Sequence, residues 1–176
     1  MTLRFSSTVA NGRQLVGMAA VAATAMMLVT ALPRQASSAE HPFSALAGSW
    51  SGSGVIKKSN GSSERIRCRS TYEPVGGAQL ALRLRCASDS YNFDLTANVV
   101  YEGGAIGGSW SEASRSVSGN ISGRANPNGS QIQAAAQAAG FNANLSISTR
   151  GGRQSVVIVS PGSEVSEVSV AMERGR

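Results

Sequence analysis

The stretch RIRCRSTYEPVGGAQLALRLRC, residues 65–86, decides the fold. Arginine, cysteine and apolar residues alternate on both sides of a Gly-Gly pair, and this period of two is typical of two β-strands joined by a tight turn. Glycine readily takes the positive φ that such a turn needs. If Cys68 lies opposite Cys86, the turn centres on Gly77. The stretch therefore predicts an antiparallel hairpin.

The predicted pairing gives the hairpin two chemically different faces, because successive side chains of a strand point to opposite sides. One face carries five arginines, namely Arg65, Arg67, Arg69, Arg83 and Arg85. The other face carries Ile66, Cys68, Ser70, Tyr72, Leu80, Leu82, Leu84 and Cys86. We expect the second face to be the core and the arginines to point away from it.

A second hairpin continues the same two faces. A two-residue turn at Ser88-Asp89 would place Leu84 opposite Phe93, and Arg83 opposite Asp94. Every apolar residue then stays on one side of three strands, and such agreement favours this register.

The rest of the chain repeats the alternation between glycine, asparagine, serine and proline breaks. It predicts an all-β fold, an antiparallel up-and-down meander that forms a closed or nearly closed barrel. Alanines in residues 131–140 favour a helix as the alternative there, but Ile132 and the alanines alternate with glutamines, so we expect a strand. The expected strands are 47–57, 62–73, 79–87, 90–101, 105–113, 117–124, 130–138, 141–149, 153–160 and 165–173.

The N-terminal residues are typical of an export signal. Residues 15–32 form an uncharged apolar run, which basic residues precede and small residues follow before Ala39. This order predicts a signal peptide over 1–39, an N-terminal tail over 40–46 and the barrel domain over 47–176. An uncleaved anchor is the alternative, because the apolar run is long for a signal. We expect no membrane span in the mature chain and a periplasmic or secreted location.

The two cysteines lie in the part expected to be exported. In an oxidising compartment Cys68 and Cys86 are expected to form one disulfide. Two buried free thiols are the alternative.

The charge balance does not indicate a nucleic-acid-binding protein. The chain has 16 basic and ten acidic residues. Arg4, Arg13 and Arg34 lie in the predicted signal and no acidic residue does, so the mature chain has 13 basic and ten acidic residues, a net charge of +3. Aromatic residues are few and no nucleic-acid-binding motif is present. Nothing in the sequence indicates an oligomeric state.

The segment LAGSW, residues 46–50, resembles the Gly-x-Trp first strand of lipocalins and other calycin barrels. In that family a basic residue of the last strand packs over the tryptophan, and Arg174 in VAMERGR matches it. The resemblance implies a barrel with either a ligand cavity or a protein-binding rim.

Two subgroups of calycin barrels are similar in further respects. The GSW segment with Cys68 and Cys86 resembles small periplasmic protease inhibitors. The ten strands resemble the fatty-acid-binding and nitrobindin types. The haem-ligating histidine of nitrobindins has no counterpart on a late strand, so haem is not implied and we expect no cofactor.

Residues for catalysis or metal binding are scarce. His41 is the only histidine and lies in the predicted tail, whereas a catalytic triad or a histidine metal site needs an imidazole held by the fold. Nothing in the spacing of Glu102 and Glu112 brings them together as an acid–base pair. We expect no enzyme and no metal, with an unrecognised hydrolase as a minor alternative.

The arginine face and the aromatic core are the candidate sites. The arginines indicate either a solvated outer face that prevents aggregation or an anion site. The aromatic residues surround either a cavity for an apolar ligand or an ordinary packed core. They are Trp50, Tyr72, Tyr91, Phe93, Tyr101, Trp110 and Phe141.

Two functions follow as hypotheses. In the first, the barrel binds a small amphipathic or anionic ligand, with an apolar tail against Tyr91, Phe93, Tyr101 and Trp110 and an acidic group near Arg67, Arg69 and Arg85. In the second, it is an envelope interaction module, such as a protease inhibitor, that acts through its rim loops or the arginine face. The partner would then be a protein or an anionic component of the envelope.

Overall fold

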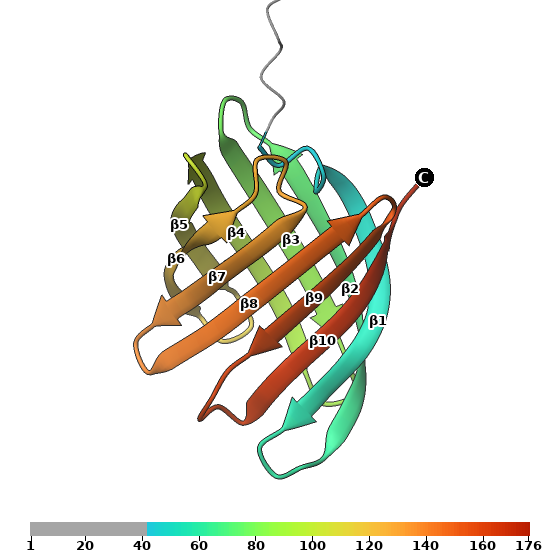
Figure 1. The fold of residues 1–176 in the computed structure, drawn as a ribbon. Helices are drawn as coiled ribbons and strands as arrows, with labels where there is room; N and C mark the ends of the chain where they lie inside the picture. Colours follow the sequence, from blue (N-terminus) through green and yellow to red (C-terminus); the bar gives the residue numbers. More distant parts are fainter. Residues whose placement is uncertain (1–41) are drawn as a thin grey trace, which may run out of the picture. The chain divides into compact units, whose positions relative to one another are not determined.

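A computed structural model describes residues 42–176 as a closed barrel of ten antiparallel strands (Figure 1). Each strand pairs with its neighbours in the sequence, and β10 closes the barrel against β1. The predicted signal peptide and His41 lie outside the described residues. The strands are β1 (Gly48–Lys58), β2 (Ser63–Pro74), β3 (Gln79–Ala87), β4 (Asn92–Glu102), β5 (Ala105–Glu112), β6 (Val117–Ala125), β7 (Gln131–Ala138), β8 (Phe141–Arg150), β9 (Arg153–Val159) and β10 (Val165–Arg174).

The predicted all-β meander is confirmed, including a strand rather than a helix over Gln131–Ala138. Alternate side chains point inward, so β2 buries Ile66, Cys68 and Ser70 between exposed arginines. Residues 42–176 contain no helix that is long and apolar enough to cross a membrane.

The first hairpin has the predicted register. Cys68 lies opposite Cys86, and the two form a disulfide on the inner side of the wall. Gly76 and Gly77 take positive φ in the turn. The apolar face is therefore the inner face, and the five arginines point outward.

The predicted register of the second hairpin is wrong by two residues. Leu84 lies opposite Leu95, and Arg85 rather than Arg83 lies opposite Asp94. The turn closes one residue later, because Ser88 both donates its backbone N–H to the carbonyl oxygen of Tyr91 and accepts the N–H of Tyr91 on its hydroxyl. A register shift of two residues keeps every side chain on the same face of the strand. The inward and outward sets were therefore predicted correctly although the partners were not.

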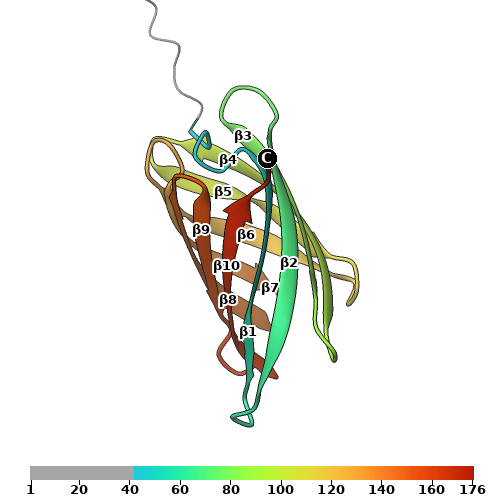
Figure 2. The same cartoon turned by 90° about the vertical axis from the view of Figure 1, so that its right-hand side faces the viewer.

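Glycine allows β1 to lie close against β10. A Cβ atom at Gly52 would lie 1.9 Å from the carbonyl oxygen of Ala171, and one at Gly54 would lie 1.9 Å from that of Ser169. Only a residue without a side chain fits such an approach of two backbones. Figure 2 shows β1 between β10 and β2, where the ends of the meander meet.

The segment before β1 closes one end of the barrel. Phe43 and Leu46, which the sequence assigns to a tail, are fully buried. The backbone N–H of Ala45 donates to the carbonyl oxygen of Asn128 in the β6–β7 turn, and the Phe43 ring lies 6.2 Å from the Tyr101 ring. This end, with the β2–β3, β4–β5, β6–β7 and β8–β9 turns, is called the N-terminal end below, and the other is called the opposite end.

Candidate functional site

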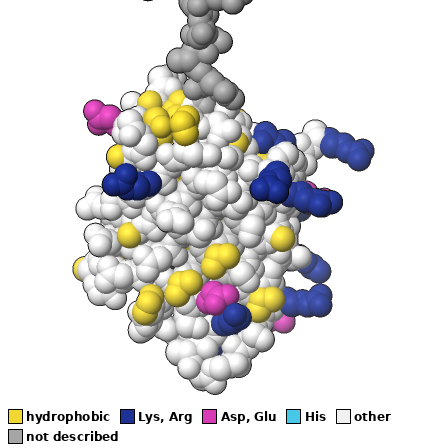
Figure 3. Space-filling view, in the orientation of Figure 1, with side chains coloured by type: hydrophobic (Ala, Val, Ile, Leu, Met, Phe, Trp, Pro, Cys, Tyr) yellow, Lys and Arg dark blue, Asp and Glu magenta, His cyan; other side chains and the backbone are white. Residues whose placement is uncertain are grey.

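The arginine face comprises Arg65, Arg67, Arg69, Arg83 and Arg85, and all five side chains are exposed on the outside of β2 and β3. Four of them line an open groove on the barrel wall, and Arg65 continues the row along β2 beyond it. Figure 3 shows Lys and Arg gathered at the edge of the molecule where β1 and β2 lie, whereas the face over β7–β10 is mostly uncharged. The structure thus brings this candidate site together on one surface.

The arginine face is poorly neutralised. Arg69 lies directly opposite Arg85, and like charges so placed destabilise a strand pair. Arg85 forms an ion pair with Asp94, with 3.2 Å between Nε and Oδ2, and its side chain is 78% exposed. An ion pair this exposed contributes only about 0–1 kcal/mol. Among residues 42–176, the other four arginines of the face have no ion pair.

Small polar side chains complete the groove. Ser51 and Ser53 of β1 lie opposite Arg69 and Arg67 on the outer surface. Thr71 lies opposite Arg83. Hydroxyl groups therefore stand beside the guanidinium groups, and both are hydrogen-bond donors that an anion can use.

The predicted aromatic residues point into the barrel but do not form one cluster. Trp110 and Phe141 lie 5.5 Å apart, and Tyr91 stacks on Phe93 with 6.2 Å between ring centroids. Tyr101 instead packs against Phe43 at the N-terminal end. The aromatic set is thus divided between the two ends of the interior.

Trp50 is held at the N-terminal end. Its indole N–H donates to the carbonyl oxygen of Leu46 at 2.7 Å, and the Arg174 guanidinium lies 4.5 Å from the ring centroid. Arg174 also donates to the carbonyl oxygens of Ala45 and Ala47. Arg174 therefore packs over the tryptophan, as expected from the resemblance, and also ties the N-terminal segment to β10.

Tyr72 belongs to a buried polar group that sequence reasoning missed. Its hydroxyl donates to Oε1 of Gln154 at 3.1 Å, and the amide of Gln154 donates to Thr149 at 3.2 Å. Burial raises the pKa of Tyr72 to about 12. The available signal was that Gln154 and Thr149 occupy inward positions of strands whose other inward residues are apolar.

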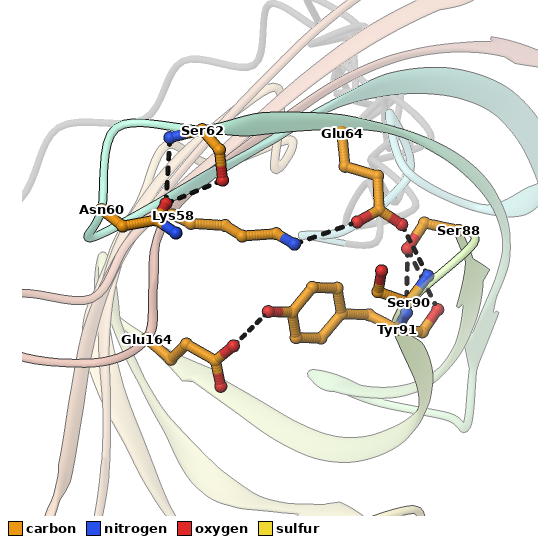
Figure 4. Close-up of polar contacts among 8 residues, drawn as sticks. All are labelled: Lys58, Asn60, Ser62, Glu64, Ser88, Ser90, Tyr91 and Glu164. Atoms are coloured by element: carbon orange, nitrogen blue, oxygen red, sulfur yellow. Dashed lines mark hydrogen bonds and ion pairs between the residues drawn. The ribbon is translucent and has the colours of Figure 1, made fainter.

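A second polar cluster, also missed, lies at the opposite end (Figure 4). Nζ of Lys58 lies 3.3 Å from Oε2 of Glu64 and 5.0 Å from the centroid of the Tyr91 ring. The Tyr91 hydroxyl donates to Oε1 of Glu164 at 2.5 Å, and this hydrogen bond raises the pKa of Tyr91. The cluster joins the β1–β2, β3–β4 and β9–β10 turns.

Glu64 is the most strongly perturbed carboxylate of this cluster. A hydrogen bond from the side chain of Ser88 and one from the backbone N–H of Ser90 lower its pKa to about 2. Both serines lie on the β3–β4 turn, far from Glu64 in the sequence, so no local pattern indicates these two partners. Each charged or hydroxyl group of the cluster has a partner. The cluster is therefore best explained as structural, because its contacts hold three turns together.

Glu102 and Glu112 lie too far apart to act as an acid–base pair. Glu112 is buried and accepts hydrogen bonds from the backbone N–H groups of Asp94, Ser114 and Arg115. Burial acts to raise its pKa, but these hydrogen bonds outweigh burial and lower it. Glu102 lies at the other end of the β4–β5 hairpin. Residues 42–176 also hold no group of three His, Cys, Asp or Glu side chains placed to bind a metal.

Comparison with solved structures identifies the kind of barrel. Rv2717c from M. tuberculosis superposes with a TM-score of 0.62 at 16% identity, covering 76% of this chain and 94% of that one. The S-type phycobiliprotein lyase CPES from Guillardia theta superposes with a TM-score of 0.53 at 8% identity, covering 75% and 89%. The chain has a lipocalin-like barrel fold. At these identities the likeness concerns the fold alone.

Comparison of sequences adds no family. No protein-family model matches the chain, and no curated protein does.

Proposed function

We propose that the protein is a non-enzymatic binding protein of the cell envelope that binds an anionic ligand on its arginine face. The observation that carries the proposal is the groove lined by Arg67, Arg69, Arg83 and Arg85, with Asp94 as the one acidic residue lining it. Guanidinium groups bind phosphate and carboxylate through paired hydrogen bonds, which favours these two classes of ligand.

The cost of the arginine face to folding supports a function for it. A solvated outer strand needs only polar side chains, and β6 has Ser118, Asn120 and Ser122 in such positions. Opposed arginines add repulsion, which the inner disulfide between Cys68 and Cys86 offsets by holding β2 to β3. A bound anion would relieve this repulsion directly.

The predicted signal peptide and the disulfide support a location outside the cytoplasm. A disulfide persists in an oxidising compartment such as the periplasm. An anionic envelope component would be available there.

The test compares two double variants that remove the same charge. Arg67→Gln with Arg69→Gln changes the groove, whereas Lys57→Gln with Arg124→Gln changes the outer wall away from it. Calorimetric titration with tripolyphosphate is expected to show binding that the groove variant weakens at least about tenfold, since a hydrogen bond to a charged group contributes roughly 1.5–3 kcal/mol. The control variant should bind as the wild type does. An equal loss of affinity for tripolyphosphate in both variants would contradict a site at the groove.

A second candidate function has its own observation. Several inward apolar side chains at and near the opposite end are only partly buried, among them Leu84, Phe93 and Phe141. A small amphipathic ligand inside the barrel would cover them. Its acidic group would meet Arg115, which lies 4.7 Å from the Phe93 ring centroid, and not the arginine face, which lies on the other side of the wall.

Native mass spectrometry of the exported protein, before and after delipidation, separates the two candidates. A mass that delipidation removes would support a ligand inside the barrel. Binding of a purified envelope protein, unaffected when Arg67 and Arg69 are replaced, would instead favour an interaction module that acts through its rim loops.

A further inference from the structure

Two grooves on the outer wall meet over β1. The groove of the arginine face has Ser51, Gly52 and Ser53 in its lining. A second groove, over β8, β9 and β10, has the same three residues in its lining, together with Arg150 and Arg153. The two grooves therefore form one furrow that crosses the barrel wall from β3 to β8, with small residues at its centre.

The second groove repeats the main feature of the first. Arg150 lies directly opposite Arg153, as Arg69 lies opposite Arg85. Neither Arg150 nor Arg153 forms an ion pair within residues 42–176. Two opposed arginine pairs thus stand at the two ends of the furrow. Both pairs are destabilising on their own.

The furrow has a net positive charge, which lies toward its two ends. Six arginines line it, against two acidic residues, Asp94 and Glu173. Asp94 is paired with Arg85. Glu173 lies opposite Ser51 on β1 and opposite Arg153 on β9, so it is the one acidic side chain between the arginine pairs.

The length of the furrow favours a polymer over a compact anion as the ligand. Five strand spacings separate β3 from β8, which is about 24 Å along the wall at about 4.8 Å per spacing. A single phosphate group reaches only one of the two arginine pairs. A chain with repeated anionic groups reaches both.

We propose that the furrow binds a linear polyanion with repeated phosphate groups, which contact Arg69 and Arg85 at one end and Arg150 and Arg153 at the other. The inference rests on the proposed function and extends its site by the second groove. Each phosphodiester carries one charge and two free oxygens, so it can accept hydrogen bonds from an arginine and a serine hydroxyl together. The furrow also suits a chain better than a membrane, since a flat bilayer surface cannot follow a path that curves around the outer wall over five of the ten strand spacings.

The experiment measures how affinity depends on ligand length, with glycerol phosphate oligomers of two and eight phosphates. The octamer is expected to bind much more tightly than the dimer. The slope of log affinity against log salt should be about −3 to −4 for the octamer and about −1 for the dimer, as about 0.7 counterions are released per neutralised phosphate of a single chain. Arg150→Gln with Arg153→Gln should lower the ratio of octamer to dimer affinity, and Arg124→Gln should leave the ratio as in the wild type.

The outcomes separate this inference from the proposed function. Equal affinities and slopes for dimer and octamer would overturn the polymer and leave a compact anion site at the arginine face. Failure of both oligomers and of tripolyphosphate to bind would overturn the two proposals together. Binding to vesicles of anionic phospholipid as tight as to the octamer would overturn the furrow in favour of a membrane surface.

Replacing Glu173 should have the opposite effect to replacing an arginine of the furrow. Its carboxylate repels a polyanion that crosses between the arginine pairs, so Glu173→Gln is expected to tighten octamer binding. Glu167→Gln removes the same charge from β10 outside the furrow lining and serves as the matched control. Weaker octamer binding by Glu173→Gln would contradict a path over β1.

Discussion

At the scale of single residues, Arg69 combines a predicted role in binding with a cost to stability. It faces Arg85 across β2 and β3, so Arg69→Thr should stabilise the barrel by about 0.2–1 kcal/mol at low salt. Urea unfolding in about 0.01 M and about 1 M NaCl tests this, because the screening length falls from roughly 30 to 3 Å and the gain should fade. Arg124→Thr is the control, since Arg124 faces Ala105 and Gln133. A gain that does not change with salt would contradict charge repulsion as its cause.

Gly52 is expected to tolerate no side chain. Its missing Cβ would lie 1.9 Å from the carbonyl oxygen of Ala171 on β10, so Gly52→Ala must push two backbones apart. We expect a loss of at least about 1–3 kcal/mol, the usual range for overpacking. Gly107→Ala is the control, because a Cβ there would have no atom within 4 Å. Thermal unfolding of the two variants tests this, and Gly52→Ala should have the lower melting temperature. Similar melting temperatures would refute the close approach of β1 to β10.

Glu64 should contribute to stability in a pH-dependent way. Its pKa is about 2 in the folded chain and 4.5 ordinarily, so the folded state favours the charged carboxylate. The contribution is therefore fully present above about pH 4.5 and is lost as the pH falls toward 2. Urea midpoints of the wild type and Glu64→Gln should differ at neutral pH and converge in acid. A difference that stays constant from pH 7 to pH 2 would show that the charge of Glu64 is not involved.

At the scale of the strands, the disulfide holds together two strands whose outer faces repel each other. Cys68 and Cys86 are separated by 18 residues, and opening a loop of this size should cost about 3 kcal/mol. The variant with both cysteines replaced by serine should lose about this much, and more at low salt, where Arg69 and Arg85 repel most. Equilibrium unfolding at two salt concentrations measures both effects. A loss that is larger at high salt would contradict the proposed link.

The two hairpins show how far sequence reasoning reaches. The register of β2 with β3 was predictable because the cysteines and the glycine turn agree on one pairing. The register of β3 with β4 was not, because pairings two residues apart place the same side chains in the core. Inward and outward sets follow from the alternation alone, whereas the partner of Asp94 depends on the hydroxyl of Ser88 in the turn.

Contacts between distant strands escape sequence reasoning for a different reason. Tyr91 and Glu164 are 73 residues apart and meet only because the barrel closes. The meeting of the two grooves over Ser51, Gly52 and Ser53 likewise depends on β10 pairing with β1. The spacing of strands and turns predicts a closed or nearly closed barrel, but it does not specify which outer residues become neighbours. The arginine face was predictable, and the furrow was not.

At the scale of the whole barrel, the N-terminal segment should be needed for stability. Phe43 and Leu46 are fully buried at the N-terminal end, and Phe43 packs on Tyr101. Phe43→Ala is therefore expected to cost about 3–5 kcal/mol, the usual loss for a buried phenylalanine. Chemical unfolding checks this, with Val75→Ala in an exposed turn as the control. A loss below about 1 kcal/mol would show that the segment is dispensable.

Whether the arginine face binds an anion can be observed on single arginines in solution. NMR of the ¹⁵N-labelled protein resolves the Nε–H groups, and tripolyphosphate is the titrant. We predict that the signals of Arg67, Arg69, Arg83 and Arg85 shift together and saturate with one dissociation constant, while the signal of Arg124 stays in place. Uniform, unsaturated shifts of all arginines, or no shifts at all, would contradict the account.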